Sequence, residues 1–569
     1  MSQSLARNWG GSRSDDWLLS ALMGLAILLT LAPVARLLIE GVSGPDGLTL
    51  APLVEVLARP TTQAALWHSI FTAGVGTVLS MLLGGAFAFL VALTDIRAKG
   101  ALVFCLMIPM MIPPQITALA WTQVMGPSSV LLKTIGLAPP LGSPQPLHSP
   151  LGIAVLLGIQ HTSIVFLTLR AGLRAIPPEA VEAARIAGAR GLRLWWQVVL
   201  PLSVPSLAAG TAMAFVTALG NFGIPAMLGI PAGYSTLPTL IYQRLAGMGT
   251  SVLTEVAVLA LLIGVVALAG VVLNRLFLRR RAYGLIGLAN RPLEISLKQL
   301  RLPVELVLWL VILAILVLPL LALAATSLVP AYGVPLSWQT MSFGGWYEAL
   351  FRQPVTARAF RNSFLLATGA AVVLMAICLP LAWIMLRRPS RLSRTFDLLV
   401  DLPYALPGVV LAIACILLFI NLPLTDLTLY GTIWIIFIAY IARFFTVMLR
   451  PVQSALAQLD PAMEEAAQSA GASLGKRLRT IILPLTAPAA AAGAILVFLT
   501  AFNELTVSAL LWSSGTETLG VVIFNLEDSG ETVMASAVSV AVVGVVIVLM
   551  GAIQLASRRL PKGVVPWQN

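Results

Sequence analysis

A segment of 25 residues occurs twice in this chain and aligns with itself without a gap. Residues 181–205 read VEAARIAGARGLRLWWQVVLPLSVP, and residues 464–488 read EEAAQSAGASLGKRLRTIILPLTAP. The matched pairs, each separated by 283 residues (465 − 182), are Glu182 and Glu465, Gly188 and Gly471, Pro201 and Pro484, and Pro205 and Pro488. A repeat of this size in 569 residues indicates that the chain consists of two related halves.

The earlier part of the chain repeats at a different offset, 294 residues (363 − 69). The pairs that match there are Ser69 and Ser363, Pro109 and Pro403, and Pro113 and Pro407. The offset shrinks because segment 126–150 is long and rich in Pro and Gly, whereas its counterpart 421–428 is short. We therefore expect a first half at residues 1–290 and a second half at residues 291–569, joined within the basic stretch 275–302.

The sequence GASLGKR at residues 471–477 has the residue types of a nucleotide-binding P-loop. A P-loop requires four residues between its glycines and a hydroxyl residue after the lysine, because that hydroxyl holds magnesium. Only three residues separate Gly471 from Gly475, and Arg477 follows Lys476. The spacing therefore disfavours a nucleotide site in this chain.

Composition indicates an integral membrane protein. Hydrophobic residues make up 59% of the chain and charged residues only 10%, whereas a soluble domain has about 25% charged residues. Twelve segments are long enough to cross a bilayer, which takes about 20 apolar residues. They are residues 17–39, 69–93, 101–125, 151–173, 202–222, 252–274, 304–326, 363–386, 398–420, 429–450, 485–511 and 534–556. We expect an all-α fold with two parallel six-helix repeats, and the first segment is too long for a signal peptide.

Charge distribution predicts the orientation of these spans. The net charge is +12, and most basic residues gather in loops on one side of the predicted membrane. The basic residues in these loops are Arg97 and Lys99 and those of the segments Arg170 to Arg193, Arg275 to Arg301, Arg387 to Arg394, Lys476 to Arg479 and Arg558 to Lys562. The positive-inside rule places them in the cytoplasm, together with both termini of a multi-pass protein in the bacterial inner membrane. Such a charge pattern reflects topology and disfavours nucleic-acid binding.

Residues for catalysis or metal binding are sparse. Cys105, Cys378 and Cys415 lie in apolar segments without the spacing of a disulfide framework or a metal cluster. The three histidines are scattered, and no clustered His, Asp or Cys residues occur at helix ends. We expect neither a metal site nor a catalytic site, and no enzyme activity in this chain.

Proline recurs inside the predicted spans, for example at Pro109, Pro113, Pro114, Pro403 and Pro407. Proline frees a backbone carbonyl, which a membrane tolerates where protein or a water-filled cavity satisfies it. Such helices are either broken and line a pathway, or merely kinked for packing. The sequence leaves both interpretations open.

The duplicated segment is predicted to form a short helix, a glycine turn and a second helix on the cytoplasmic side. Proline with a nearby carboxylate, as in Pro178-Glu179 and Asp460-Pro461, is typical of a helix start. A short Ala-rich helix follows and ends at Gly188 or Gly471. We expect the Leu-Pro that closes the segment to open the next membrane helix.

This pattern, E-A-A, three residues, Gly, and later an apolar pair with Leu-Pro, resembles the EAA loop of permeases of ATP-binding-cassette (ABC) importers. The loops span about residues 174–201 and 451–484. The resemblance implies that each short helix docks on a cytoplasmic ATPase, with the glutamate available to a basic partner group. The ATPase-contact residues implied are Glu182, Ala183, Ala184, Gly188, Glu465, Ala466, Ala467 and Gly471.

The resemblance also implies partners and a cargo. A separate ATPase, in two copies, would bind ATP and magnesium, and an extracellular or periplasmic binding protein would deliver the cargo. Fused permeases of this length are similar to the ferric-iron transport group, and relatives carry 2-aminoethylphosphonate, thiamine or polyamines. A twelve-helix secondary transporter is the more remote alternative, because its loop between the second and third helices would differ from TDIRAKG at residues 94–100.

One repeated stretch bears on the cargo. FVTALGNFGIPA at residues 215–226 matches FLTAFNELTVSA at residues 498–509, which places Asn221 opposite Glu504. An ionisable residue within a membrane segment is costly and faces partner groups or a pathway. Glu504, Asn503 and Asn221 either line a route that favours cationic cargo or form a structural hydrogen-bonded pair. Arg443 is a candidate counter-charge, although the sequence does not place it near Glu504.

Overall fold

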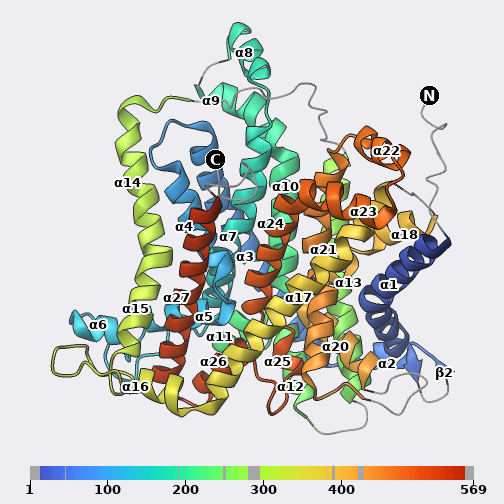
Figure 1. Ribbon diagram of the computed structural model, residues 1–569. Coiled ribbons are helices and arrows are strands. Elements are labelled where there is room, and N and C mark those ends of the chain that lie inside the picture. The colour runs from blue at the N-terminus through green and yellow to red at the C-terminus, as the bar shows by residue number, and fades with distance from the viewer. Residues whose placement is uncertain are drawn as a thin grey trace.

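The computed structural model describes residues 13–44, 47–189, 191–247, 252–279, 295–387, 391–420 and 428–557 (Figure 1). The predicted basic segments 280–294 and 558–562, and most of the outer segment 421–428, lie outside the described residues. The described chain is almost entirely helical. Ten of its helices are long and apolar enough to cross a membrane, and the number rises to twelve if each of two bent helix pairs counts as one span. The predicted all-α membrane fold is confirmed.

The first half contains one short hairpin among its helices. The antiparallel strands pair Ser43 with Leu48 and Gly44 with Gly47. In chain order the elements are α1 (Arg13–Gly41), β1 (Ser43–Gly44), β2 (Gly47–Leu48), α2 (Ala51–Ala58), α3 (Pro60–Leu93), α4 (Lys99–Met111), α5 (Pro114–Val124), α6 (Val130–Thr134), α7 (Pro150–Arg174), α8 (Pro178–Ile186), α9 (Gly191–Leu194), the π-helix η1 (Trp195–Val199), α10 (Leu200–Leu219), α11 (Gly223–Gly229), α12 (Leu237–Leu245) and α13 (Val252–Arg279).

The second half has the corresponding order without a described strand. Its elements are the 3₁₀-helix η2 (Lys298–Leu300), α14 (Arg301–Ile312), the π-helix η3 (Leu313–Val317), α15 (Leu318–Ser327), α16 (Gly344–Tyr347), the π-helix η4 (Glu348–Arg352), α17 (Pro354–Arg387), α18 (Arg391–Leu399), α19 (Leu402–Ala405), α20 (Gly408–Phe419), α21 (Ile433–Ala457), α22 (Pro461–Ser469), α23 (Leu474–Arg477), the π-helix η5 (Leu478–Ile482), α24 (Leu483–Phe502), α25 (Ser508–Leu511), α26 (Leu519–Asp528) and α27 (Thr532–Ser557).

Each half is built on three mutually packed helices. These are α3, α7 and α10 in the first half and α17, α21 and α24 in the second. Small residues allow the close approach that membrane helices use for association. At Gly84 of α3, an added Cβ would lie only 2.6 Å from the carbonyl oxygen of Thr162 in α7. Nearby, the Ser80 hydroxyl donates to the Gly158 carbonyl at 2.8 Å.

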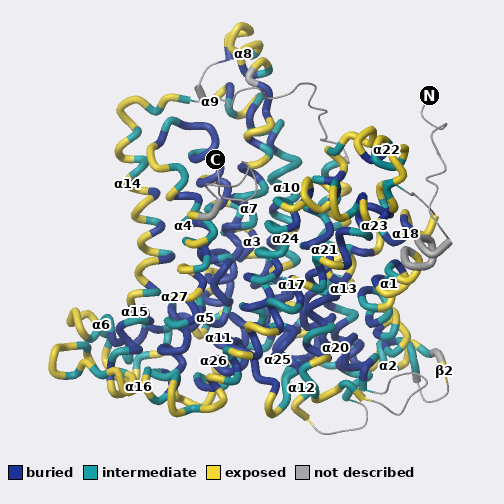
Figure 2. Tube along the Cα trace, viewed as in Figure 1, coloured by how far each residue is buried: buried dark blue, intermediate teal, exposed yellow. Residues whose placement is uncertain are grey.

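The outer helices of each half pack against the other half. Helices α1 and α13 contact α20 of the second half, and α15 contacts α5 of the first. Helix α14, which precedes α15, also lies beside α4 (Figure 1). The buried positions concentrate where these bundles meet, whereas α14 and the tip of α8 are largely exposed (Figure 2). The halves are thus interlocked by their peripheral helices.

The third predicted span of each half is broken. The predicted span 101–125 corresponds to α4 and α5, which meet at Pro113 with a bend of 103°. The predicted span 398–420 corresponds to α18–α19 and α20, which meet at Pro407 with a bend of 109°. Proline removes a helix hydrogen bond at each break. Of the two interpretations that the sequence left open for these prolines, the broken helix is the one observed.

The prediction for the Leu-Pro pairs of the duplicated segments needs correction. They do not open a new helix. Instead, α9, η1 and α10 run on as one helix through Pro201, and α23, η5 and α24 do so through Pro484. A π-helical turn directly precedes each pair, and a widened turn accommodates a proline that cannot donate to the usual carbonyl.

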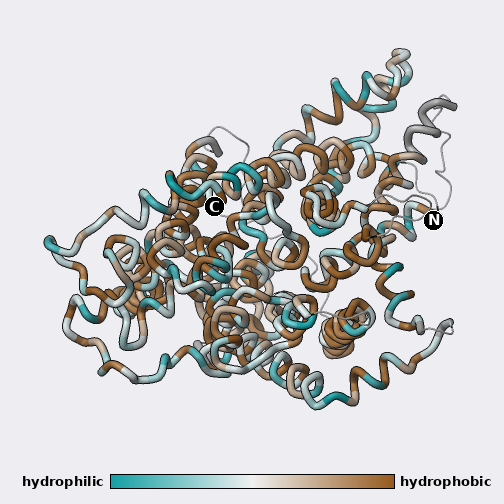
Figure 3. Tube along the Cα trace, turned by 90° about the horizontal axis from the view of Figure 1, so that it is seen from below, coloured by the Kyte–Doolittle hydropathy of each residue, from teal (hydrophilic) through white to brown (hydrophobic). Residues whose placement is uncertain are grey.

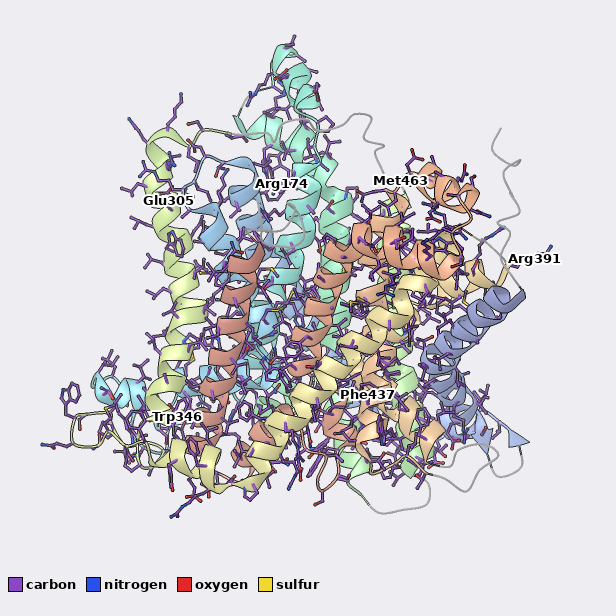
Figure 4. The ribbon with its side chains drawn as sticks, viewed as in Figure 1. Arg174, Glu305, Trp346, Arg391, Phe437 and Met463 are labelled. Atoms are coloured by element: carbon purple, nitrogen blue, oxygen red, sulfur yellow. The ribbon has the colours of Figure 1, made fainter. Side chains whose placement is uncertain are left out.

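The two ends of the molecule differ in character. Helices α8 and α22 project from the same end, and α6, α12 and α16 lie at the other (Figure 1). Arg174, Glu305, Arg391 and Met463 lie toward the α8 end, and Trp346 lies at the opposite end (Figure 4). Seen from that opposite end, the helices are mainly hydrophobic and hydrophilic residues gather in the connecting segments (Figure 3). Exposed apolar side chains on α14, such as Leu306 and Leu310, suit a lipid environment.

Candidate coupling loops and central cavity

The duplicated loops form the predicted helix, glycine turn and second helix. Pro178 is the first residue of α8 with Glu179 in its first turn, and the Asp460 carboxylate caps α22 by accepting the Ala462 N–H at 2.9 Å. Carboxylates at these positions favour the positive end of the helix dipole. We call residues 174–201 and 451–484 the first and second coupling loops.

Each short helix ends in the same way. Gly188 has φ +87° and Gly471 has φ +78°, a left-handed conformation that favours glycine. The residue after each glycine donates its N–H to a carbonyl within the short helix. Ala189 donates to Ala184 O at 2.9 Å, and Ala472 donates to Ala467 O at 3.0 Å. This Schellman arrangement satisfies the open carbonyls of the helix end. The glycine of the pattern therefore has a backbone role in both loops.

The residues implied to contact an ATPase are largely accessible. Glu182, Ala183, Gly188, Ala466 and Gly471 are exposed, and Ala184, Glu465 and Ala467 are partly buried. Two apolar side chains add to this surface, because Ile186 of α8 is 89% exposed and Met463 of α22 is 48% exposed. Each short helix therefore presents small, apolar and acidic groups together.

The second coupling loop has an anchor that sequence reasoning missed. Glu464, the first glutamate of EEAA, is 2% exposed and turned toward α17. Its Oε2 accepts the Trp383 indole N–H at 2.7 Å, and its Oε1 pairs with Arg387 Nε at 3.3 Å. The first half has fully buried Val181 at the matching position. The loops are thus held to their bundles by different chemistry, polar in the second half and apolar in the first.

A cavity of about 210 Å³ lies between the two halves at the broken helices. It brings together Asn221, Asn503 and Glu504, the three predicted pathway residues. Its lining also includes Arg443 and His161, one of the three histidines that are scattered in the sequence. Both break points line the cavity, at Pro113 and Pro407. We call it the central cavity.

Asn221 and Glu504 each cap the short helix that follows them. The Asn221 Oδ1 accepts the Ile224 N–H at 3.1 Å, and the Glu504 Oε1 accepts the Val507 N–H at 2.9 Å. The second Glu504 oxygen, Oε2, pairs with Arg443 Nε at 3.5 Å. The candidate counter-charge is therefore close to Glu504, and both carboxylate oxygens have protein partners.

The carbonyls freed at the two breaks are satisfied by corresponding residues. Gln160 Nε2 donates to Ile112 O at 3.1 Å in the first half, and Arg443 Nη1 donates to Leu406 O at 3.4 Å in the second. Gln160 and Arg443 are 283 residues apart (443 − 160), the offset of the repeat. The same structural task is thus performed by a neutral amide in one half and a guanidinium in the other.

Asn503 and its counterpart Gly220 connect the halves. The Asn503 Nδ2 donates to Met111 O of α4 at 2.7 Å. At Gly220, an added Cβ would lie 2.4 Å from Pro407 Cβ across the interface. Asn503 and Gly220, which directly precede Glu504 and Asn221, therefore each contact the broken helix of the opposite half.

A second cavity of about 360 Å³ opens at the end away from the coupling loops. Its lining includes His148, Tyr332 and Glu527. Burial raises the pKa of the Glu527 carboxyl and lowers that of His148. Burial, and then the nearby Glu527 charge, raise the pKa of Tyr332 to about 12. These three groups thus favour their uncharged forms.

No group of three His, Cys, Asp or Glu side chains among the described residues could hold a metal ion. Cys105, Cys378 and Cys415 are free thiols, and none is fully exposed.

Comparison with known proteins identifies the family. The sequence pattern of the family described as "binding-protein-dependent transport system inner membrane component" matches residues 81–283 and residues 376–562, more than half of the chain. The chain belongs to this family. It is a permease of ABC transport systems with two fused halves, and each match contains one coupling loop.

Curated relatives of the permease differ in the cargo that they are named for. This permease is 28% identical to a probable ABC transporter permease protein, y4fN, of Sinorhizobium fredii, over 97% of both chains. It is 24% identical to the ferric transport system permease protein FbpB of Actinobacillus pleuropneumoniae, over 97% of the permease and 80% of that protein. A putative 2-aminoethylphosphonate transport system permease protein, PhnU, of Salmonella choleraesuis is 27% identical over 40% of the permease and 80% of its own length.

Proposed function

We propose that this permease forms the cargo pathway of an ABC importer and is driven through its two coupling loops by a separate cytoplasmic ATPase. The observation that carries the proposal is the repeated geometry of α8 and α22. Each is a short helix with a proline start and a Schellman end, and both project from the same end of the molecule. That end and both termini would face the cytoplasm of a bacterial inner membrane, in keeping with the positive-inside rule.

Two ATPase copies would bind ATP and magnesium and accept one coupling loop each. Glu182 and Glu465 would provide carboxylates to basic groups of the ATPase, with Ala183, Ala466 and the exposed Ile186 and Met463 as the apolar contact. ATP binding would draw the two loops together, and the interlocked halves would convert that movement into alternating access. A binding protein on the other side of the membrane would deliver the cargo.

Within the membrane, the central cavity would be the point that the cargo passes. It lies between the halves and carries polar groups from both, including Asn221, Asn503 and Glu504. Access is alternated in such proteins around a site near the middle of the membrane, where irregular backbone is tolerated because it lines a cavity. The broken helices at Pro113 and Pro407 have this character.

Ferric iron is the first cargo to test. The relative named for ferric transport aligns over nearly the whole permease, which supports iron. The relative named for 2-aminoethylphosphonate aligns over one part of it and supports that compound as the second candidate, with thiamine and polyamines behind it. Uptake of radiolabelled ferric iron should be lost on gene deletion and regained on restoration.

The coupling role is tested by reversing two charges. In the complete transporter, Glu182→Lys combined with Glu465→Lys should abolish uptake and release the ATPase during purification. The control is Glu531→Lys, an exposed position beside α27 at the opposite end, which should leave both unchanged. Retained ATPase and normal uptake in the double variant would refute the coupling role.

A further inference from the structure

The central cavity contains the ion pair Arg443 and Glu504, and the fold does not require the charges of these two residues. In the first half, Gln160 satisfies the freed carbonyl and Asn221 caps the following helix without any formal charge. In the second half, Arg443 satisfies the freed carbonyl and Glu504 caps the following helix, at the corresponding positions. Charged side chains within a membrane are costly and are retained for function. Among the described residues that line this cavity, these two are the only ones with a formal charge.

The two charges are not equally available. Both oxygens of Glu504 are engaged, by the Val507 N–H and by Arg443. Arg443 uses its Nε and Nη1, and its Nη2 has no hydrogen-bond partner among the described residues. The Arg443 side chain is also more exposed, at 20% against 11% for Glu504. The guanidinium is therefore the charge that the cavity offers to an incoming molecule.

The neighbouring backbone leaves room for this guanidinium. At Gly408, the first residue of α20, an added Cβ would lie 3.2 Å from Arg443 Cζ. The first half has Pro114 at the matching position, 294 residues earlier (408 − 114). Asn221 adds a second donor, because its Nδ2 has no partner within the described part of the chain. Guanidinium and amide N–H groups are typical ligands of oxyanions.

We infer that the central cavity receives its cargo by an oxyanion group that binds Arg443, while Glu504 balances the Arg443 charge when no cargo is present. This inference rests on the proposed role of the cavity as the cargo pathway. It replaces the expectation that Glu504 favours cations, and of the two candidate cargoes it favours 2-aminoethylphosphonate, which carries an oxyanion, over the bare ferric cation. Asn221 is the additional donor from the opposite half, so that an oxyanion would bridge the two halves at the level of the broken helices.

Charged thiol reagents test the inference without knowledge of the cargo. Cys105, Cys378 and Cys415 are changed to Ala, and Thr500→Cys places one thiol in the cavity, with Thr217→Cys as the matched position of the first half. The full transporter in membrane vesicles is treated with sulfonatoethyl methanethiosulfonate, an anion, or the trimethylammonium analogue, a cation. Rates are divided by the rate of each reagent with a free thiol in solution.

We expect the anionic reagent to react faster by roughly tenfold, because a charged, water-poor cleft concentrates ions of opposite sign. Arg443→Gln, which copies Gln160, leaves the Glu504 charge unpaired and should lower the ratio to one or below. Glu504→Asn, which copies Asn221, should preserve the anion preference. The double variant with both changes carries the neutral pair of the first half and should show no preference, which separates charge from folding.

The outcomes distinguish the inference from the proposed function. Preference for the cationic reagent while Arg443 is present, or an anion preference that survives Arg443→Gln, would overturn the oxyanion assignment while the pathway role remains. If neither cysteine reacts with either reagent, with or without ATP, the cavity is not on the cargo pathway, and the proposed role of the cavity fails together with the inference.

Discussion

Adjacent glutamates of the second coupling loop, Glu464 and Glu465, have opposite environments. The Glu464 carboxylate is buried against Trp383 and Arg387, whereas Glu465 is partly exposed on the surface of α22. A single helix position thus separates attachment to the membrane bundle from presentation to a partner.

Replacing the buried glutamate should loosen the loop. Glu464→Ala removes the carboxylate partner of Arg387 and the acceptor of the Trp383 N–H. Within the described chain, Arg387 then keeps only its hydrogen bond to Leu459 O, and breaking a buried pair in this way costs about 3–5 kcal/mol. We expect a lower thermal midpoint of the detergent-solubilised permease, measured without the ATPase. Glu465→Ala is the matched control and should retain the midpoint while it weakens ATPase binding. Equal thermal effects of the two changes would contradict this division.

The cost of replacing Gly188 or Gly471 should depend only on how readily the new residue adopts a left-handed backbone conformation. No neighbouring atom lies within 4 Å of a Cβ added at Gly188 or Gly471, so crowding makes no contribution. Gly471→Val should destabilise the end of α22 by about 1–2 kcal/mol, the cost of a left-handed conformation. Gly471→Asn should cost less, because asparagine visits this region. Hydrogen exchange at the Ala472 amide, which donates to Ala467, reports the difference.

Contact between the halves should be sensitive to volume at Gly220. The methyl group of Gly220→Ala would overlap Pro407, and overpacking of this kind costs about 1–3 kcal/mol. Uptake should fall and the thermal midpoint should drop. Gly544→Ala in α27, where an added Cβ meets nothing within 4 Å, is the control. Normal uptake by Gly220→Ala would show that this contact is absent during transport.

An ion pair away from the coupling loops should give the permease an acid-sensitive step. Arg358 Nε and Glu517 Oε2 lie 2.9 Å apart, and Asn362 Nδ2 donates to the carbonyls of Gly515 and Glu517. Burial alone would raise the pKa of Glu517, but hydrogen bonds from Arg358 and the Gly515 N–H outweigh it and lower the pKa below the ordinary 4.5.

A carboxyl with a lowered pKa stabilises the folded state above its ordinary pKa, and this contribution is lost as the pH falls through the lowered value. The thermal midpoint should therefore fall as the pH drops below 4.5. The fall should be smaller in Glu517→Gln, which lacks the titrating group. Identical pH profiles for both proteins would exclude this ion pair as the cause.

Repetition made much of the fold predictable. The Pro-Glu and Asp-Pro starts, the Ala-rich turns and the two glycines determine the coupling helices locally, so the sequence was sufficient there. Comparison of the repeats could also have found the Glu464 anchor, because Val181 at the matching position indicates a buried face. The signal was present, but only the second of the two consecutive glutamates, Glu465, was assigned a role from the sequence.

Other features depend on distant contacts that a sequence pattern does not encode. The proximity of Arg443 to Glu504 arises from the packing of α21 beside the turn before α25. The bends at Pro113 and Pro407 depend on distant side chains that donate hydrogen bonds to the freed carbonyls, here Gln160 and Arg443. Proline alone allowed either a kink or a break. The continuous helix through Pro201 was missed because a π-helical turn leaves no mark in hydropathy.

The interlocked halves impose an order of events during synthesis. Helix α1 ends at Gly41, but α20, against which it packs, begins at Gly408, about 370 residues later (408 − 41). At roughly 5–20 residues per second, a ribosome needs on the order of 20 to 70 s to cover that distance. During this time α1 lies in the lipid with its interface to α20 uncovered. Helix α13, which ends at Arg279, waits for a shorter part of it. A helix of the second half therefore completes the packing of the first half, and a nascent chain that stops early leaves an open surface for membrane quality-control proteases.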